Sequence, residues 1–128
     1  MTRKQISTFE ALQGQLQSFH QEFTTLTKKS PNDAVNKFKL GLANAALKDT
    51  NTFLGKSGRP FASFDQFDEE SLPTNSDVLM IISQYLSALE KVRADHGRMW
   101  GGNWYWVCSD DDSDRPSIRM ATLRKIEK

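Results

Sequence analysis

The residues whose types and spacing could support chemistry cluster in the stretch GGNWYWVCSDDDSDRP, at positions 101–116. Four carboxylates follow its aromatic residues: Asp110, Asp111, Asp112 and Asp114. Three of them stand at alternate positions, as do the residues that begin a calcium-binding loop. The pattern then fails, because Arg115 stands where that loop needs Gly, and Ala121 where it needs a bidentate Glu. We therefore expect a solvated acidic turn here and no metal site.

Cys108, directly before this turn, is the only cysteine in the chain. Nearby carboxylates raise the pKa of a thiol and so suppress the thiolate that a nucleophile needs. We expect Cys108 to be a small apolar packing residue. A lone cysteine forms no internal disulfide, which suits a reducing compartment and favours a cytoplasmic protein.

The aromatic strip before the turn reads WYWVC and has the composition of a short strand. In a strand, Trp104 and Trp106 point to one face, and Tyr105 and Val107 to the other. Both faces are apolar, so the strand is covered on both sides, or it leaves a surface for a protein partner or a pocket for a small ligand. In the partner interpretation, the four aspartates steer basic groups and three tryptophans are the anchors: Trp100, Trp104 and Trp106.

A second group of acidic and aromatic residues lies in the connection at positions 56–76. Three Phe recur there at every third position among four carboxylates, a pattern that indicates a short helix or 3-10 turn pinned over the core. Such carboxylates could share one helical face and chelate a cation or serve as acid and base, but the pattern favours a solvated face above the three Phe. An alternative ligand pocket, between this connection and the aromatic strand, would be lined by Phe61, Phe64, Asp65, Asp68, Tyr85 and His96.

The charges of this 128-residue chain are unevenly distributed, although its formal net charge is only +1. Residues 1–59 carry a net +5, residues 60–114 a net −8 and residues 115–128 a net +4. The blocks either neutralise one another or present faces to charged partners. Eight Phe and three Trp argue against disorder, and no apolar run is long enough to predict a membrane span.

The first predicted helix spans residues 7–29 and carries an apolar heptad. Its seam consists of Phe9, Leu12, Leu16, Phe19, Phe23 and Leu26. Ser7 and Glu10 have the spacing of a capping box at its start. A spare seam of this kind favours self-association, so a homodimer through this helix is an open alternative.

Two further helices are predicted from apolar periodicity and capping residues. One spans residues 31–54, with Ser30 as its N-cap. The other spans residues 75–96, where Thr74 and Asp77 resemble a capping box. The connection between the first two helices is so short that they should form an antiparallel hairpin.

Residues 103–126 are predicted to form a β-hairpin, in which the acidic turn joins the aromatic strand to a second strand at SIRMATLRKI. Two strands alone are marginally stable, so this hairpin must lean on the helices. The predicted fold class is mainly α (α+β). Residues 1–128 would form a single domain, with a three-helix bundle, an antiparallel helical hairpin, an aromatic crossover segment and a small C-terminal β-hairpin.

The sequence shows no catalytic constellation, no phosphate-binding loop and no metal-spaced pair of His, so no catalytic residue, metal or cofactor is assigned. We predict a small intracellular, non-enzymatic protein-binding module, of adaptor, inhibitor or immunity type, that offers its aromatic and acidic surface to a partner of basic character. The first alternative is a ligand-binding or enzymatic domain that uses the pocket described above. The second is a nucleic-acid-binding protein that uses the basic helical hairpin.

Overall fold

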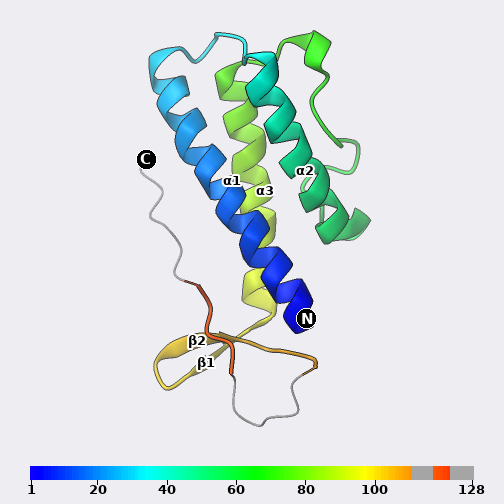
Figure 1. The fold of residues 1–128 in the computed structure, drawn as a ribbon, viewed down its shortest axis with the longest axis vertical. Coiled ribbons are helices and arrows are strands. Elements are labelled where there is room, and N and C mark those ends of the chain that lie inside the picture. Colours follow the sequence, from blue (N-terminus) through cyan, green and yellow to red (C-terminus); the bar gives the residue numbers. More distant parts are fainter. Residues whose placement is uncertain (111–116, 122–128) are drawn as a thin grey trace.

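The structure of the chain is a computed structural model that describes residues 1–110 and 117–121. The elements in these ranges are α1 (Arg3–Lys29), α2 (Lys37–Gly58), the 3-10 turn η1 (Glu69–Ser71), α3 (Asn75–Asp95), β1 (Gly97–Trp100) and β2 (Asn103–Trp106). The helices run side by side, and the two strands form a small antiparallel hairpin at the end where α1 begins and α3 ends (Figure 1). The mainly α class predicted from the sequence is confirmed.

The first helix starts earlier than its sequence pattern suggests. Thr2 is the N-cap of α1, and its hydroxyl oxygen accepts a hydrogen bond from the amide of Gln5 over 3.2 Å. The side chain of Gln5 in turn accepts a hydrogen bond from the amide of Thr2 over 2.8 Å. The expected capping box was at Ser7 and Glu10. The observed one lies five residues earlier, so α1 has an extra turn at its start.

The second helix starts later than expected, after Asn36, whose side chain accepts a hydrogen bond from the amide of Lys39. Ser30, the expected N-cap of this helix, is instead the C-cap of α1. The backbone between them pairs with the chain ahead of α3, where the amide of Val35 donates to the carbonyl of Pro73 over 2.9 Å. Residues 31–36 are therefore not part of α2. They bond to the backbone that precedes α3 and so hold the starts of α2 and α3 together.

The core lies along α1 and α3, with α2 closing one side. Its largest fully buried side chains are Trp106, Tyr85, Phe9, Phe23, Leu16, Leu40, Leu47, Ile82, Leu89 and Val78. Four of the six residues in the heptad seam of α1 are buried in this core: Phe9, Leu12, Leu16 and Phe23. These four residues of the seam therefore pack within their own chain.

The connection from α2 to α3 is held against α2 by side chains of that helix. Asn44 exchanges two hydrogen bonds with the backbone of Phe67, at 2.8 and 3.0 Å. Asn51 donates to the carbonyl of Asp65 over 3.0 Å. The short helix or 3-10 turn expected at the three Phe, residues 61–67, is not present; the 3-10 turn η1 follows them, and the start of α3 comes next.

The third helix begins as its sequence predicts. Thr74 is its N-cap, and its hydroxyl accepts a hydrogen bond from the amide of Asp77 over 3.2 Å. The Asp77 carboxylate accepts one from the amide of Thr74 over 2.9 Å, which completes the capping box. The helix ends at Asp95, with His96 as its C-cap.

The hairpin uses a different pair of strands from the predicted one. β1 and β2 pair across the two-residue loop Gly101–Gly102, with Met99 opposite Trp104. Both glycines have positive φ, 57° and 82°, as tight loops between twisted strands require. The expected second strand is represented, within residues 117–121, by a single bridge between Tyr105 and Arg119. Positions 122–126 of that strand lie outside the described residues.

Candidate binding surface on the C-terminal hairpin

Trp106 fixes the hairpin to the bundle. Its side chain is 2% exposed, and its ring meets the ring of Phe9 edge-on at a centroid distance of 4.9 Å. Its indole nitrogen donates a hydrogen bond to the carboxylate of Glu10 over 2.9 Å. Trp106 is therefore a core residue, and its expected role as an exposed anchor is corrected.

The outer half of the same strand face lies outside this core. Trp104 points to the same side of the ribbon as Trp106, but it is 47% exposed. Met99 stands directly opposite Trp104 and is 53% exposed. The sequence did not decide whether this strand face is core or surface. In the structure its inner half, at Trp106, belongs to the core, and its outer half, at Trp104, is exposed.

On the opposite face of the hairpin, the Arg98 guanidinium lies over the ring of Trp100. Trp100, next to the loop, is 43% exposed, and the guanidinium carbon of Arg98 lies 5.1 Å from its ring centroid. Arg119 donates to the side-chain oxygen of Asn103 over 2.8 Å. Val107, just after β2, is half exposed.

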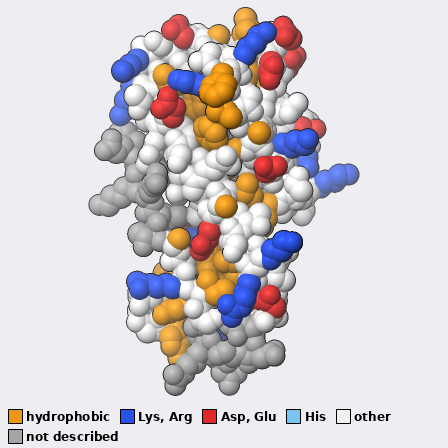
Figure 2. All heavy atoms as spheres, in the orientation of Figure 1, with side chains coloured by type: hydrophobic (Ala, Val, Ile, Leu, Met, Phe, Trp, Pro, Cys, Tyr) orange, Lys and Arg blue, Asp and Glu red, His pale blue; other side chains and the backbone are white. Residues whose placement is uncertain are grey.

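These residues define the hairpin surface: Met99, Trp100, Trp104 and Val107. In Figure 2, apolar side chains at the hairpin end of the molecule lie among charged ones. Two of the three tryptophans singled out from the sequence, Trp100 and Trp104, belong to this surface.

Asp110 has a role within the chain. Its carboxylate oxygens accept hydrogen bonds from the amide of Arg3 at 3.1 and 3.3 Å, so it lies at the positive N-terminus of α1. The thiol of Cys108 donates to the same carboxylate over 2.6 Å. That bond raises the pKa of the Cys108 thiol and lowers the pKa of Asp110. The other three aspartates expected to steer a partner, Asp111, Asp112 and Asp114, lie outside the described residues.

The lowered pKa of Asp110 predicts a pH-dependent contribution to stability. Because this pKa lies below its ordinary value of 3.8, ionised Asp110 stabilises the fold above that pH, and the contribution is lost as the pH falls through the lowered value. We expect Asp110→Asn to lower the melting temperature at neutral pH. The difference in melting temperature between this variant and the wild type should become smaller in acid. Thermal melts of both chains across the acidic range test this. Two curves that stay parallel throughout would contradict it.

Two of the six residues of the alternative ligand pocket, Phe64 and Tyr85, are neighbours, with ring centroids 6.3 Å apart. Tyr85 is fully buried, and its hydroxyl donates to Asn51 over 2.6 Å, while Phe64 packs on Phe67. Asp65 is paired with Arg59, and Phe61 is exposed. His96 ends α3, where its carbonyl accepts a hydrogen bond from the amide of Val107. A pocket shared by all six residues stays a prediction.

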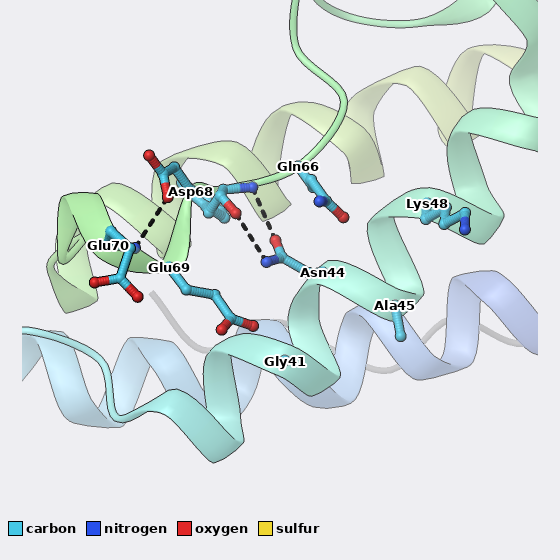
Figure 3. A pocket seen from close by; sticks show the side chains of 9 residues that line it. Gly41, Asn44, Ala45, Lys48, Gln66, Asp68, Glu69 and Glu70 are labelled. Atoms are coloured by element: carbon cyan, nitrogen blue, oxygen red, sulfur yellow. Dashed lines mark hydrogen bonds between the residues drawn. The ribbon is translucent and has the colours of Figure 1, made fainter.

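An open hollow of about 540 Å³ does lie beside the connection, but α2 forms one wall of it (Figure 3). Of the six expected pocket residues only Asp68 lines it, and its carboxylate caps η1 by accepting from the amide of Glu70 over 3.0 Å. Figure 3 shows Asn44 reaching across to the connection, where its amide is already bonded to the backbone. A second hollow of about 510 Å³, between the end of α2 and α3, contains none of the six.

Two residues of this surface, Met99 and Val107, were not among the anchors predicted from the sequence, and neither was the strand β1 predicted. The available signal was the Gly-Gly pair at 101–102 with an aromatic residue on its N-terminal side, which is a two-residue hairpin loop pattern. The predicted hairpin instead has its turn at the acidic residues that follow β2.

Comparison with known proteins adds no relative. A scan against protein-family models, a search of curated proteins and a search of solved structures each give no match to this chain. Within the described part of the chain, none of the helices combines the length and apolar character needed to cross a membrane. The same residues contain no group of three or more His, Cys, Asp or Glu placed to hold a metal ion.

Proposed function

We propose that this chain is a small protein-binding module that contacts its partner through the hairpin surface. The observation that carries the proposal is the exposure of four large apolar side chains on one short ribbon, each between 43% and 53%. Contiguous apolar patches on a protein surface mark interaction sites, and Trp is enriched among residues that dominate binding energy. The hairpin surface thus offers one Trp anchor on each face of the ribbon, with flexible Met99 beside Trp104.

The way the hairpin is attached also supports this function. Trp106 locks the inner half of the ribbon to Phe9, so the outer half is held in place before a partner arrives. Binding then costs little ordering of the backbone, which favours affinity. Trp side chains have few rotatable bonds, so their ordering costs little as well.

Substitution of the two exposed tryptophans tests this proposal. We expect the double variant Trp100→Ala with Trp104→Ala to lose affinity for its protein partner by about 30-fold or more, the loss that follows when a hot-spot residue worth about 2 kcal/mol is removed. The measurement is affinity capture from extracts of the source cells, followed by titration of the captured protein. Circular dichroism first establishes that the variant is folded.

Phe38→Ala is the matched control, because Phe38 is a 76% exposed aromatic on α2, outside the hairpin surface. The control is expected to capture the same partner as the wild type with unchanged affinity. A folded double variant that retains the partner, or a Phe38→Ala chain that loses it, would contradict the proposal.

A further inference from the structure

We propose that the partner binds as an extended peptide segment, of acidic and apolar residues, that adds a strand to the outer edge of β1. This inference rests on the proposed function and specifies how the hairpin surface is used. An acidic segment takes the place of the basic partner expected from the sequence, because Asp110 is bonded within the chain and the charges of the described ribbon are cations. Three features of the ribbon support it: the direction of the β1 backbone groups, the side chains beside that edge, and the charge on it.

The register of the hairpin determines which backbone groups of β1 face outward. In an antiparallel pair, opposite residues alternate between hydrogen-bonded and non-hydrogen-bonded pairs. The amide of Val107 donates to the carbonyl of His96 over 2.8 Å, so the pairs two and four residues further along are bonded too. These are Arg98 with Tyr105 and Trp100 with Asn103. The backbone groups of Met99, between them, therefore point away from β2.

The corresponding edge of β2 is already used. The backbone amide of Trp106 donates to the carbonyl of Ile118 over 2.8 Å, and the backbone amide of Met120 donates to the carbonyl of Trp104 over 3.0 Å. Among residues 1–110 and 117–121, no further backbone hydrogen bond involves the outward groups of Met99. Exposed backbone groups on an edge strand are a template for another strand.

The side chains beside this edge suit an extended peptide. Residues of an added strand alternate between the two faces of the ribbon, so one set meets Met99 and Trp104, and the other meets Arg98 and Trp100. All four side chains are exposed. Apolar residues of the peptide gain contact on the Met99 face, and a carboxylate gains the Arg98 guanidinium on the other.

Charge selects the peptide over a second copy of the chain. Arg98 and Arg119 are the charged side chains of residues 97–107 and 117–121. A second copy that paired antiparallel along β1 would add its own Arg98 to the same face of this edge, so it would bring a like charge and no carboxylate to the ribbon. An acidic segment instead complements the cation, which also speeds association.

Two displayed libraries of extended peptides, each of about ten residues, provide the probe for this proposal. Alternate positions are randomised among apolar residues, and the positions between them are Glu in one library and Lys in the other. We expect binders from the Glu library alone. Equal recovery from both libraries, or no binder from either, would overturn the inference.

Two substitutions at one position then separate strand addition from simple apolar contact. Met99→Pro removes the outward amide, while Met99→Ala removes the side chain and keeps that amide. Selected peptides should bind Met99→Pro about tenfold more weakly than Met99→Ala, because one buried hydrogen bond is lost. Equal affinities for the two variants would exclude strand addition but leave the proposed function standing.

A second measurement applies if Met99→Pro does not fold. N-methylation of alternate amides in the selected peptide should abolish binding to the wild-type chain in one register and leave it intact in the other. Binding that is unaffected in both registers would overturn the inference. So would a concentration-dependent dimer of the wild-type chain, by sedimentation, that the selected peptide dissociates, because the occupant of the edge would then be a second copy.

Discussion

Trp106→Ala is expected to lower the free energy of unfolding by about 3 to 5 kcal/mol, the range for removal of a large aromatic from a core. The side chain is 2% exposed, and it is the contact through which the hairpin meets the Phe9 ring. Its loss leaves a cavity and also removes the hydrogen bond from the indole nitrogen to Glu10. Urea denaturation followed by circular dichroism measures the effect.

Trp104→Ala is the control for this experiment, because Trp104 lies on the same face of the same strand and is 47% exposed. We expect it to cost about 1 kcal/mol or less, since much of its surface stays in water in the folded chain. If both substitutions destabilise the chain equally, the division of this strand face into a core half and a surface half is wrong.

The second large effect is expected at Asn51, which joins α2 to both α3 and the connection. Its side-chain oxygen accepts the hydroxyl hydrogen of Tyr85 over 2.6 Å, and its amide donates to the carbonyl of Asp65 over 3.0 Å. Tyr85 is fully buried, and burial is the main cause of its raised pKa. Asn51→Ala leaves that hydroxyl without an acceptor, and we expect it to cost about 2 to 4 kcal/mol.

A double-mutant cycle with Tyr85→Phe tests this explanation. When the hydroxyl is already absent, Asn51→Ala no longer leaves an orphaned donor, so its cost should fall by about 1 kcal/mol or more. Unfolding free energies of the two single variants and the double variant, all by urea denaturation, provide the comparison. Strictly additive costs would show that the pair is not coupled and that Asn51 acts through the connection alone.

The helices were predictable because their apolar periodicity also defines the core. The capping box at Thr74 and Asp77 was found from spacing alone, and the structure confirms it. The start of α1 was misplaced because two capping boxes are compatible with the sequence there. Glu10, which would have completed the second one, instead accepts the indole hydrogen of Trp106. That contact joins residues distant in the sequence, so no local pattern reveals it.

The candidate surface could be predicted only in part, because its limits too depend on contacts between residues that are distant in the sequence. Alternation along the strand places Trp104 and Trp106 on one face, but it does not say where the bundle stops covering that face. The boundary depends on where Phe9 meets the ribbon. Asn44 and Asn51, which fix the connection, are polar residues on a helix, and such residues usually face solvent.

The central claim is that the outer half of the hairpin is the binding surface. Hydrogen exchange of backbone amides, measured by mass spectrometry with and without the captured partner, tests it most directly. We expect the partner to slow exchange in peptides that cover residues 97–107, and to leave exchange unchanged in peptides from the exposed side of α2 around Phe38. Slowed exchange around Phe38 or along the hollow beside Asn44, with none at residues 97–107, would contradict it.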